Sequence, residues 1–310
     1  MKEDFLNPDD AWEIFGVKGQ DDFISKFLKK GKFHKDVPEK IIRDYEKVER
    51  LIFYSYFYYP LIDEAFGKST RIFEASMNLK IEQLNLKSHK KFESLNSKID
   101  KLQDYFSREL ISQFKEVKEL RNLFAHHKAG RLMGFSILRA FTHNINMINS
   151  IFLEKEEIEK MESSIEDLRK KSEGLKNGLY ILNGRDNNAY LIWAATPYTS
   201  WIKDSKLYSL WVFHPVIKAD NVENFTQLPN PFFHDLEDVQ FDENSLTAID
   251  GKTGNKISLM KINNRAFHKD LDAHNDLSKK LKETDRHLYA LQVKREIALG
   301  IAEFIYKYAW

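Results

Sequence analysis

The chain contains no cysteine among its 310 residues. This absence excludes disulfide bonds, zinc sites with thiolate ligands and cysteine nucleophiles, and it suits a reducing compartment. Long apolar runs are also lacking, because the most apolar stretch, 51–62, is shorter than the roughly 20 residues that a transmembrane helix needs. The N-terminus carries acidic residues and no apolar signal-peptide core. We therefore expect a cytoplasmic protein without a membrane-spanning segment.

An excess of charge of one sign is missing overall but present locally. The 48 Lys and Arg residues nearly balance 47 Asp and Glu residues, giving a formal net charge of +1, which argues against broad non-specific binding to duplexes. Between Leu120 and Leu153, however, no acidic residue occurs. This stretch holds Arg121, His126, His127, Lys128, Arg131, Arg139 and His143. Such a local positive field draws anions toward one site.

Hydrophobic periodicity predicts four successive segments. Residues 1–37 predict a short helical lead-in, and residues 38–153 predict a helical bundle. Residues 154–177 are highly charged with a narrow apolar seam, which predicts a connecting helix. Residues 178–310 predict a β-containing module with C-terminal helices.

The period changes from helical to strand-like after Gly178. Two hairpin signals, with turns at 183–188 and 250–255, predict a small, mostly antiparallel β unit over 178–263. A strong final helix is expected near 284–308. The expected fold class is therefore α+β, mainly α.

The most informative motif is the hexapeptide Arg121-Asn122-Leu123-Phe124-Ala125-His126. Cleavage of RNA by attack of a ribose 2′-hydroxyl on its own phosphate needs a group that moves a proton near neutral pH, and His126 supplies an imidazole. Charge that grows on the phosphoryl oxygens needs a fixed cation, which the guanidinium of Arg121 supplies. Asn122 lies four residues before His126, so its amide can fix the imidazole tautomer.

The spacing of this pair bears on the oligomeric state. Arg121 and His126 are five residues apart, so one straight helix does not aim both side chains at one phosphate. Either the helix distorts near Ala125, or two chains contribute across a two-fold axis. We favour the homodimer, because each chain then adds one histidine and one arginine.

The stretch 119–127, Glu-Leu-Arg-Asn-Leu-Phe-Ala-His-His, resembles the signature of the HEPN superfamily (higher eukaryotes and prokaryotes nucleotide-binding domain). The resemblance implies an all-helical bundle over about 38–153, with Arg121 and His126 as the catalytic pair and Asn122 in support. It also implies a metal-independent, cofactor-free endoribonuclease that acts on RNA as a dimer, in a toxin–antitoxin or anti-phage role, with an antitoxin or regulatory partner. His127, Lys128 and Arg131 are assigned to substrate binding.

One departure from the family is informative. In HEPN toxins paired with a nucleotidyltransferase antitoxin, the second residue after the histidine is a tyrosine that becomes modified, and here it is Lys128. That regulation is therefore not expected. Two alternatives stay open: a non-catalytic helical module that binds nucleotide, RNA or a partner protein, and a scaffold that uses the 154–174 helix and the aromatic β unit.

Three weaker patterns have simpler interpretations. The aromatic run 53–59 suits base stacking, but a buried helix explains it better. His268, Asp270, Asp272 and His274 suit a metal site, but a solvated helix start is preferred. Gly251-Lys252-Thr253 is a hairpin turn and not a P-loop, because Leu246 stands where that motif has glycine.

Overall fold

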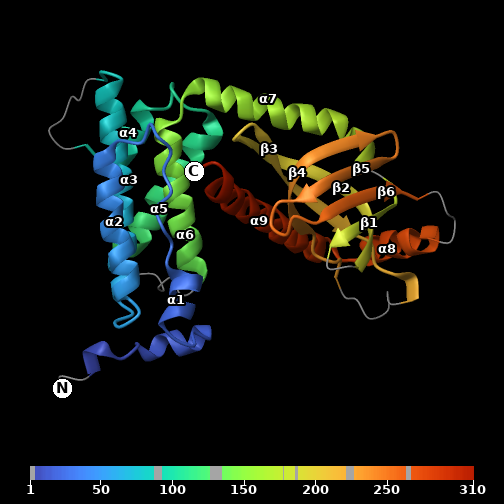
Figure 1. The fold of residues 1–310 in the computed structure, drawn as a ribbon, viewed down its shortest axis with the longest axis horizontal. Helices are drawn as coiled ribbons and strands as arrows, with labels where there is room; N and C mark the ends of the chain where they lie inside the picture. The colour runs from blue at the N-terminus through green and yellow to red at the C-terminus, as the bar shows by residue number, and fades with distance from the viewer. Residues whose placement is uncertain are drawn as a thin grey trace. The chain divides into compact units, whose positions relative to one another are not determined.

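The computed structural model describes residues 4–86, 93–125, 135–176, 178–185, 188–220, 227–262 and 267–310. Contacts between residues divide the chain into unit 1, residues 1–153 with Trp310, and unit 2, residues 154–309. Figure 1 shows the helices of the first and the sheet of the second. In the part of the chain that is described, no helix is both long and apolar enough to cross a membrane.

Unit 1 is helical. Its elements are η1 (Asp4–Leu6), η2 (Asp10–Phe15), α1 (Gln20–Phe27), α2 (Glu39–Tyr54), α3 (Leu61–Gln83), α4 (Leu95–Lys101), α5 (Arg108–Ala125) and α6 (Phe135–Phe152). The central helix is α3, against which α2, α4, α5 and α6 pack. In its core Phe66 packs edge-on against Phe141 of α6, and Phe73 lies against Phe114 of α5, with ring centroids 5.7 Å apart in both pairs.

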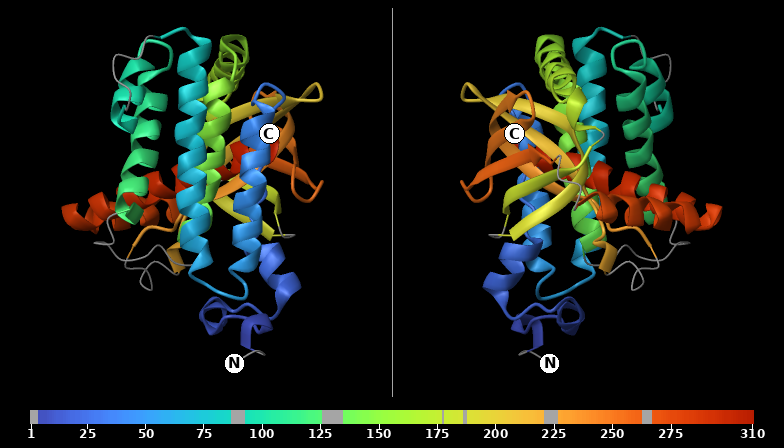
Figure 2. Two further views of the ribbon diagram at one scale, coloured as in Figure 1. Left: turned by 90° about the vertical axis from the view of Figure 1, so that its left-hand side faces the viewer. Right: turned by 90° about the vertical axis from the view of Figure 1, so that its right-hand side faces the viewer.

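The helices of unit 1 alternate in direction. A tight turn around Pro60 reverses the chain between α2 and α3, as expected for a residue that cannot continue a helix. In Figures 1 and 2, the last residues of α2 and α5 lie at the same end of unit 1 as the first residues of α3 and α6. The end of α5, with Arg121 and Asn122, therefore lies at the same end of unit 1 as the α2–α3 turn.

The N-terminal segment covers that turn with an aromatic cluster. Trp12 of η2 is buried between Phe23, Phe27 and Tyr59, with ring centroids 4.7–4.9 Å apart. Its indole N–H donates to the carbonyl of Ser55 (2.7 Å), and this directional bond fixes the orientation of the buried ring.

Unit 2 combines a β-barrel with helices. Its elements are α7 (Lys155–Lys171), η3 (Glu173–Leu175), β1 (Tyr180–Arg185), β2 (Asn188–Lys203), β3 (Lys206–Pro215), β4 (Phe232–Asp242), β5 (Ser245–Asp250), β6 (Lys256–Lys261), α8 (His268–Lys280) and α9 (Glu283–Tyr308). The strands follow chain order, and antiparallel pairing of β1 with β6 closes the barrel.

Alternation along the strands fills the barrel interior. On β5, Leu246, Ala248 and Asp250 are buried, whereas the residues between them are partly exposed. Apolar side chains make up most of the interior, including Trp211 and Phe213. On the outside, Phe304 and Tyr308 of α9 form a second cluster on β3 and β4.

The expected fold class, an HEPN-like helical bundle with a small β module, is wrong. Six strands close into a barrel instead of forming separate hairpins. The closing pair aligns Tyr180 with Lys261, residues far apart in the chain, so no local turn signal reveals it. The strand Phe232–Asp242 was also missed, because its inward positions include His234 and its alternation breaks at a bulge near Asp238.

Candidate site at the end of helix α5

Arg121 lies in the last described turn of α5. The helix is anchored by Phe114 and Val117, which are almost completely buried. Arg121 follows Val117 by four residues and so leaves the helix on nearly the same side. Its side chain is nevertheless 39% exposed. The backbone at Arg121 is thus fixed by packing, while the guanidinium reaches solvent.

A carboxylate from α3 holds this guanidinium. Oε2 of Glu74 lies 3.6 Å from Nη2 of Arg121, and Oε1 of Glu74 accepts a hydrogen bond from Nζ of Lys98 at 2.7 Å. Lys98, from α4, has an 11% exposed side chain and therefore needs the carboxylate to offset its loss of hydration. Two cations share one anion, so a net positive charge remains beside the exposed arginine.

The other predicted site residues are placed only in part. Asn122 is partly buried in the same turn of α5. His126, His127, Lys128 and Arg131 lie outside the described residues. Of the predicted catalytic set, the structure therefore describes Arg121 and Asn122.

His143 belongs to the acid-free stretch 120–153 and packs within unit 1. Its ring lies between α6 and α5, with Nε2 3.9 Å from Oε2 of Glu116 and a side chain 20% exposed. Burial lowers the pKa of His143, and the nearby charge of Glu116 offsets this only in part. The position favours a neutral, packed imidazole.

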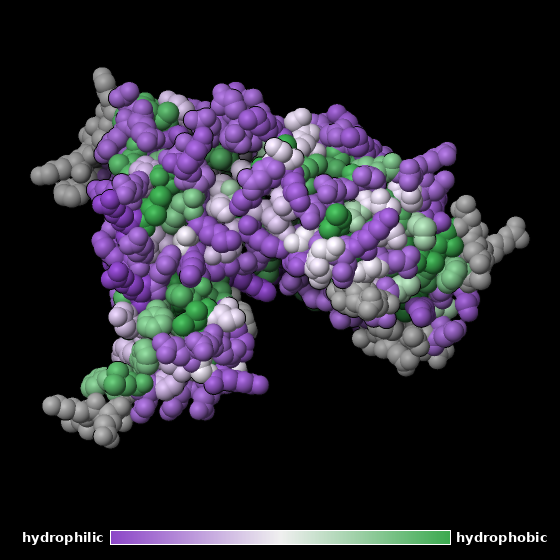
Figure 3. Space-filling model, in the orientation of Figure 1, coloured by the Kyte–Doolittle hydropathy of each residue, from purple (hydrophilic) through white to green (hydrophobic). Residues whose placement is uncertain are grey.

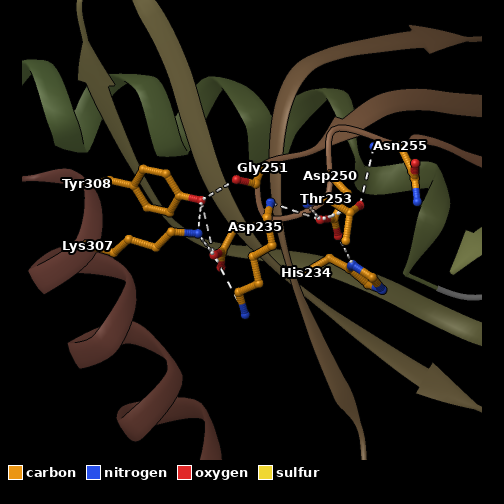
Figure 4. A network of polar contacts seen from close by, with 9 residues as sticks. His234, Asp235, Asp250, Gly251, Thr253, Asn255, Lys307 and Tyr308 are labelled. Atoms are coloured by element: carbon orange, nitrogen blue, oxygen red, sulfur yellow. Dashed lines mark hydrogen bonds and ion pairs between the residues drawn. The ribbon is translucent and has the colours of Figure 1, made fainter. Parts of the chain in front are cut away.

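Unit 2 contains a polar network that sequence reasoning missed (Figure 4). His234 of β4 and Asp250 of β5 meet at 2.6 Å between Nδ1 and Oδ2, and both are buried. Oδ1 of Asp250 accepts hydrogen bonds from the backbone N–H groups of Lys252 and Thr253 (2.9 and 2.8 Å). Burial raises the pKa of Asp250, but these bonds and the one with His234 outweigh it, so the pKa lies below its ordinary value.

The neighbouring residue on β4 points outward to α9. The buried carboxylate of Asp235 lies 3.2 Å from both the hydroxyl of Tyr308 and Nζ of Lys307. Burial and the charge of Asp235 raise the pKa of Tyr308 far above its ordinary value, which keeps its hydroxyl a hydrogen-bond donor. The rings of Phe213 and Phe232 pack edge-on against the ring of His234. The network thus links β4, the turn after β5 and α9.

The histidines and aspartates at 268–274 differ from the expectation at two positions. Asp270 and His274 are buried, so the expectation of a solvated helix start is wrong for these two residues. Oδ1 of Asp270 accepts from the backbone N–H of Ala219 at 2.7 Å, which gives the carboxylate a structural partner. In the described ranges no group of three or more His, Cys, Asp or Glu residues could hold a metal ion.

Glu74 and Lys98 are the residues near the motif that the sequence did not reveal. No helical spacing links either residue to Arg121, because they lie in other helices. Both of those helices contain many other charged residues. Only the packing of α4 and α5 against α3 brings them together.

No protein-family model, curated protein or solved structure matches this chain. The HEPN likeness is therefore a resemblance of the hexapeptide alone, and any function has to be argued from the chemistry of the chain's own residues.

Proposed function

We propose that this protein is a metal-independent endoribonuclease that cleaves RNA by 2′-hydroxyl attack, in a toxin or anti-phage defence role. The observation that carries the proposal is the half-exposed guanidinium of Arg121, held at the end of α5 by a carboxylate already shared with Lys98. A cation that is oriented but not fully neutralised suits stabilisation of a phosphoryl oxygen.

His126 is the proposed proton-transfer group, one residue beyond the described part of α5. The imidazole removes the proton of the 2′-hydroxyl, whose oxygen then forms a bond to phosphorus while the bond to the 5′-oxygen breaks. A second acid returns a proton to that leaving oxygen. The products are a 2′,3′-cyclic phosphate and a 5′-hydroxyl, with no metal required.

We propose that two chains build the site. The helix continues through Ala125, so distortion of the helix before that residue does not account for the five-residue offset. A two-fold pair brings two histidines and two arginines to one cleft, which provides separate acid and base groups. RNA is the proposed substrate, and an antitoxin or regulatory protein is a further proposed partner.

Purified protein incubated with RNA in excess EDTA tests the proposal. We expect cleavage products that end in 2′,3′-cyclic phosphate, and no cleavage when every ribose carries a 2′-O-methyl group. Cleavage abolished by EDTA, or cleavage of the 2′-O-methylated RNA, would exclude the mechanism. Expression in a bacterium is expected to be toxic for the wild type and harmless for His126→Ala.

The ion pair between Arg121 and Glu74 also favours a second candidate function. An arginine with a carboxylate partner is common in structural networks. On this alternative the basic end of unit 1 binds RNA, nucleotide or a protein without cutting. RNA binding in the absence of any cleavage product, with Arg121→Ala affecting binding alone, would favour it.

A further inference from the structure

The aromatic run at the α2–α3 turn is split between two environments. Tyr56 and Tyr59 are each only 6% exposed, and both contact the N-terminal aromatic cluster. Tyr54 and Tyr58 are instead 54% and 59% exposed. The interpretation of this run as core is therefore right for one pair of tyrosines and leaves the other pair in solvent.

The two exposed rings are held one helical turn apart. The backbone N–H of Tyr58 donates to the carbonyl of Tyr54 at 3.3 Å, which continues the helical geometry past the end of α2. The ring of Phe53 packs edge-on against that of Tyr54, with centroids 5.5 Å apart. A tyrosine packed in this way loses little conformational freedom when a flat partner stacks on it.

Charged side chains of both signs continue the same helix face, because the exposed Glu46 lies one turn before Arg50 and basic residues lie beside it. Arg50, one turn before Tyr54, is exposed and pairs with no carboxylate in the part of the chain that the structure describes. Further along the face, Lys47 pairs with Asp44 at 2.6 Å, and Arg43 pairs with Glu39. These are exposed pairs within one helix, each worth only about 0.3–0.5 kcal/mol. A phosphate can therefore replace their carboxylates at little cost.

The C-terminal end of α2, which carries Arg50 and Tyr54, lies at the same end of unit 1 as the end of α5 (Figures 1 and 2). In Figure 3, hydrophobic surface is interleaved with hydrophilic surface over that end of the unit. Tyr54, Tyr58 and Arg50 are each exposed near the end of α2, so two aromatic rings and one cation are available to the same ligand.

We propose that Tyr54 and Tyr58 form a stacking platform for single-stranded RNA, with Arg50 on the adjoining phosphate. Every base has a flat π-face, so two rings can each take one base regardless of sequence, while the cation follows the backbone. The proposal rests on the proposed function, since it supplies the grip on the strand that Arg121 and His126 would cut.

Binding of a fluorescent, fully 2′-O-methylated oligouridine to the full chain, followed by anisotropy, tests the platform. The modification blocks 2′-hydroxyl attack, so affinity is measured whether or not the protein is a nuclease. We expect Tyr54→Ala and Tyr58→Ala each to weaken binding by roughly 5- to 100-fold, the range for loss of one stacked base. Tyr105→Ala is the matched control, because this tyrosine is 50% exposed elsewhere in unit 1.

Two further variants separate stacking from apolar contact. Tyr54→Phe keeps the ring and should bind like the wild type, whereas Tyr54→Leu keeps the apolar character and should bind as weakly as Tyr54→Ala. Arg50→Ala should lower the slope of log affinity against log salt by about 0.7, the value for one phosphate contact on a single strand.

Unchanged affinity in Tyr54→Ala and Tyr58→Ala, full affinity in Tyr54→Leu, or an equal loss in Tyr105→Ala would overturn the platform. Binding of anionic lipid vesicles in place of the oligonucleotide would also overturn it and would identify a membrane surface. If the wild type binds through these tyrosines but never cleaves unmodified RNA, the platform stands and the nuclease proposal fails.

Discussion

Glu74 and Arg121 meet across the α3–α5 interface, with Oε2 3.6 Å from Nη2, while the other oxygen of the carboxylate binds Lys98. The contact ties the one described cation of the hexapeptide to the interior of unit 1. It makes Glu74 a positioning residue in the proposed site, because it acts on the substrate only through Arg121.

Glu74→Gln tests this role. The amide keeps the size of the side chain but loses the charge that both cations face, so Lys98 loses its anion in a nearly buried place. We expect the free energy of unfolding to fall by about 1–3 kcal/mol, the cost of a buried polar group left poorly satisfied. Chemical denaturation measures it.

Activity separates positioning from stability in that variant. Lys98→Met removes the buried charge and leaves Glu74 to Arg121 alone, so it serves as the matched control. If Glu74 orients Arg121, Glu74→Gln should lower the single-turnover rate at saturating RNA, while Lys98→Met should leave it largely intact. Equal rates in Glu74→Gln and the wild type would show that Glu74 is only structural.

Buried and partly buried histidines predict a loss of stability in mild acid. Burial holds the pKa of His143 below its ordinary value of 6.5, and it also lowers the pKa values of His214 and His274. The unfolded chain therefore binds protons near pH 6.5 that the folded chain does not yet accept. The contribution of these histidines to the free energy of unfolding is complete above pH 6.5. It is lost as the pH falls toward their pKa values in the folded chain.

Denaturation curves at several pH values below 7 check this sign. His143→Gln should make the pH dependence shallower, whereas His287→Gln, at an exposed position of α9, should leave it unchanged. Stability that rises on acidification in this range would contradict the assignment of neutral, buried imidazoles.

Gly251 and Tyr308 predict a specific rescue. A Cβ at Gly251 would lie 2.7 Å from the hydroxyl oxygen of Tyr308 but 3.6 Å from its Cζ. Gly251→Ala should therefore be destabilising in the wild type by about 1–3 kcal/mol, as for other overpacked sites. In a Tyr308→Phe background the clash with the hydroxyl is gone and only the 3.3 Å approach to the backbone oxygen of Asp235 remains, so the alanine should cost clearly less. Additive costs in the double-mutant cycle would refute this close contact.

Helices were more predictable than the barrel for a physical reason. Apolar positions at helical spacing are a local signal for α2 and α3, and Pro60 is a local signal for the break between them. A barrel depends instead on pairs such as Tyr180 with Lys261, which local spacing does not encode. The same holds for the site: the hexapeptide identifies Arg121, but its partner Glu74 is supplied by packing.

Mixing of subunits tests the proposed composite site. Wild-type protein is unfolded and refolded together with the inactive double variant Arg121→Ala/His126→Ala. Because the proposed cleft needs a histidine from each chain, mixed pairs should be inactive, so activity should fall as the square of the wild-type fraction. Activity that falls in direct proportion to the wild-type fraction would place each complete site within one chain.

The central claim is tested most directly by the single-turnover rate of RNA cleavage in EDTA, compared between wild type, Arg121→Ala, His126→Ala and the exposed-arginine control Arg108→Ala at the start of α5. We predict a fall of about 10²–10³ for the first two variants, as for loss of one electrostatic donor, and a near wild-type rate for the control. Cleavage that persists unchanged in both Arg121→Ala and His126→Ala would contradict the account.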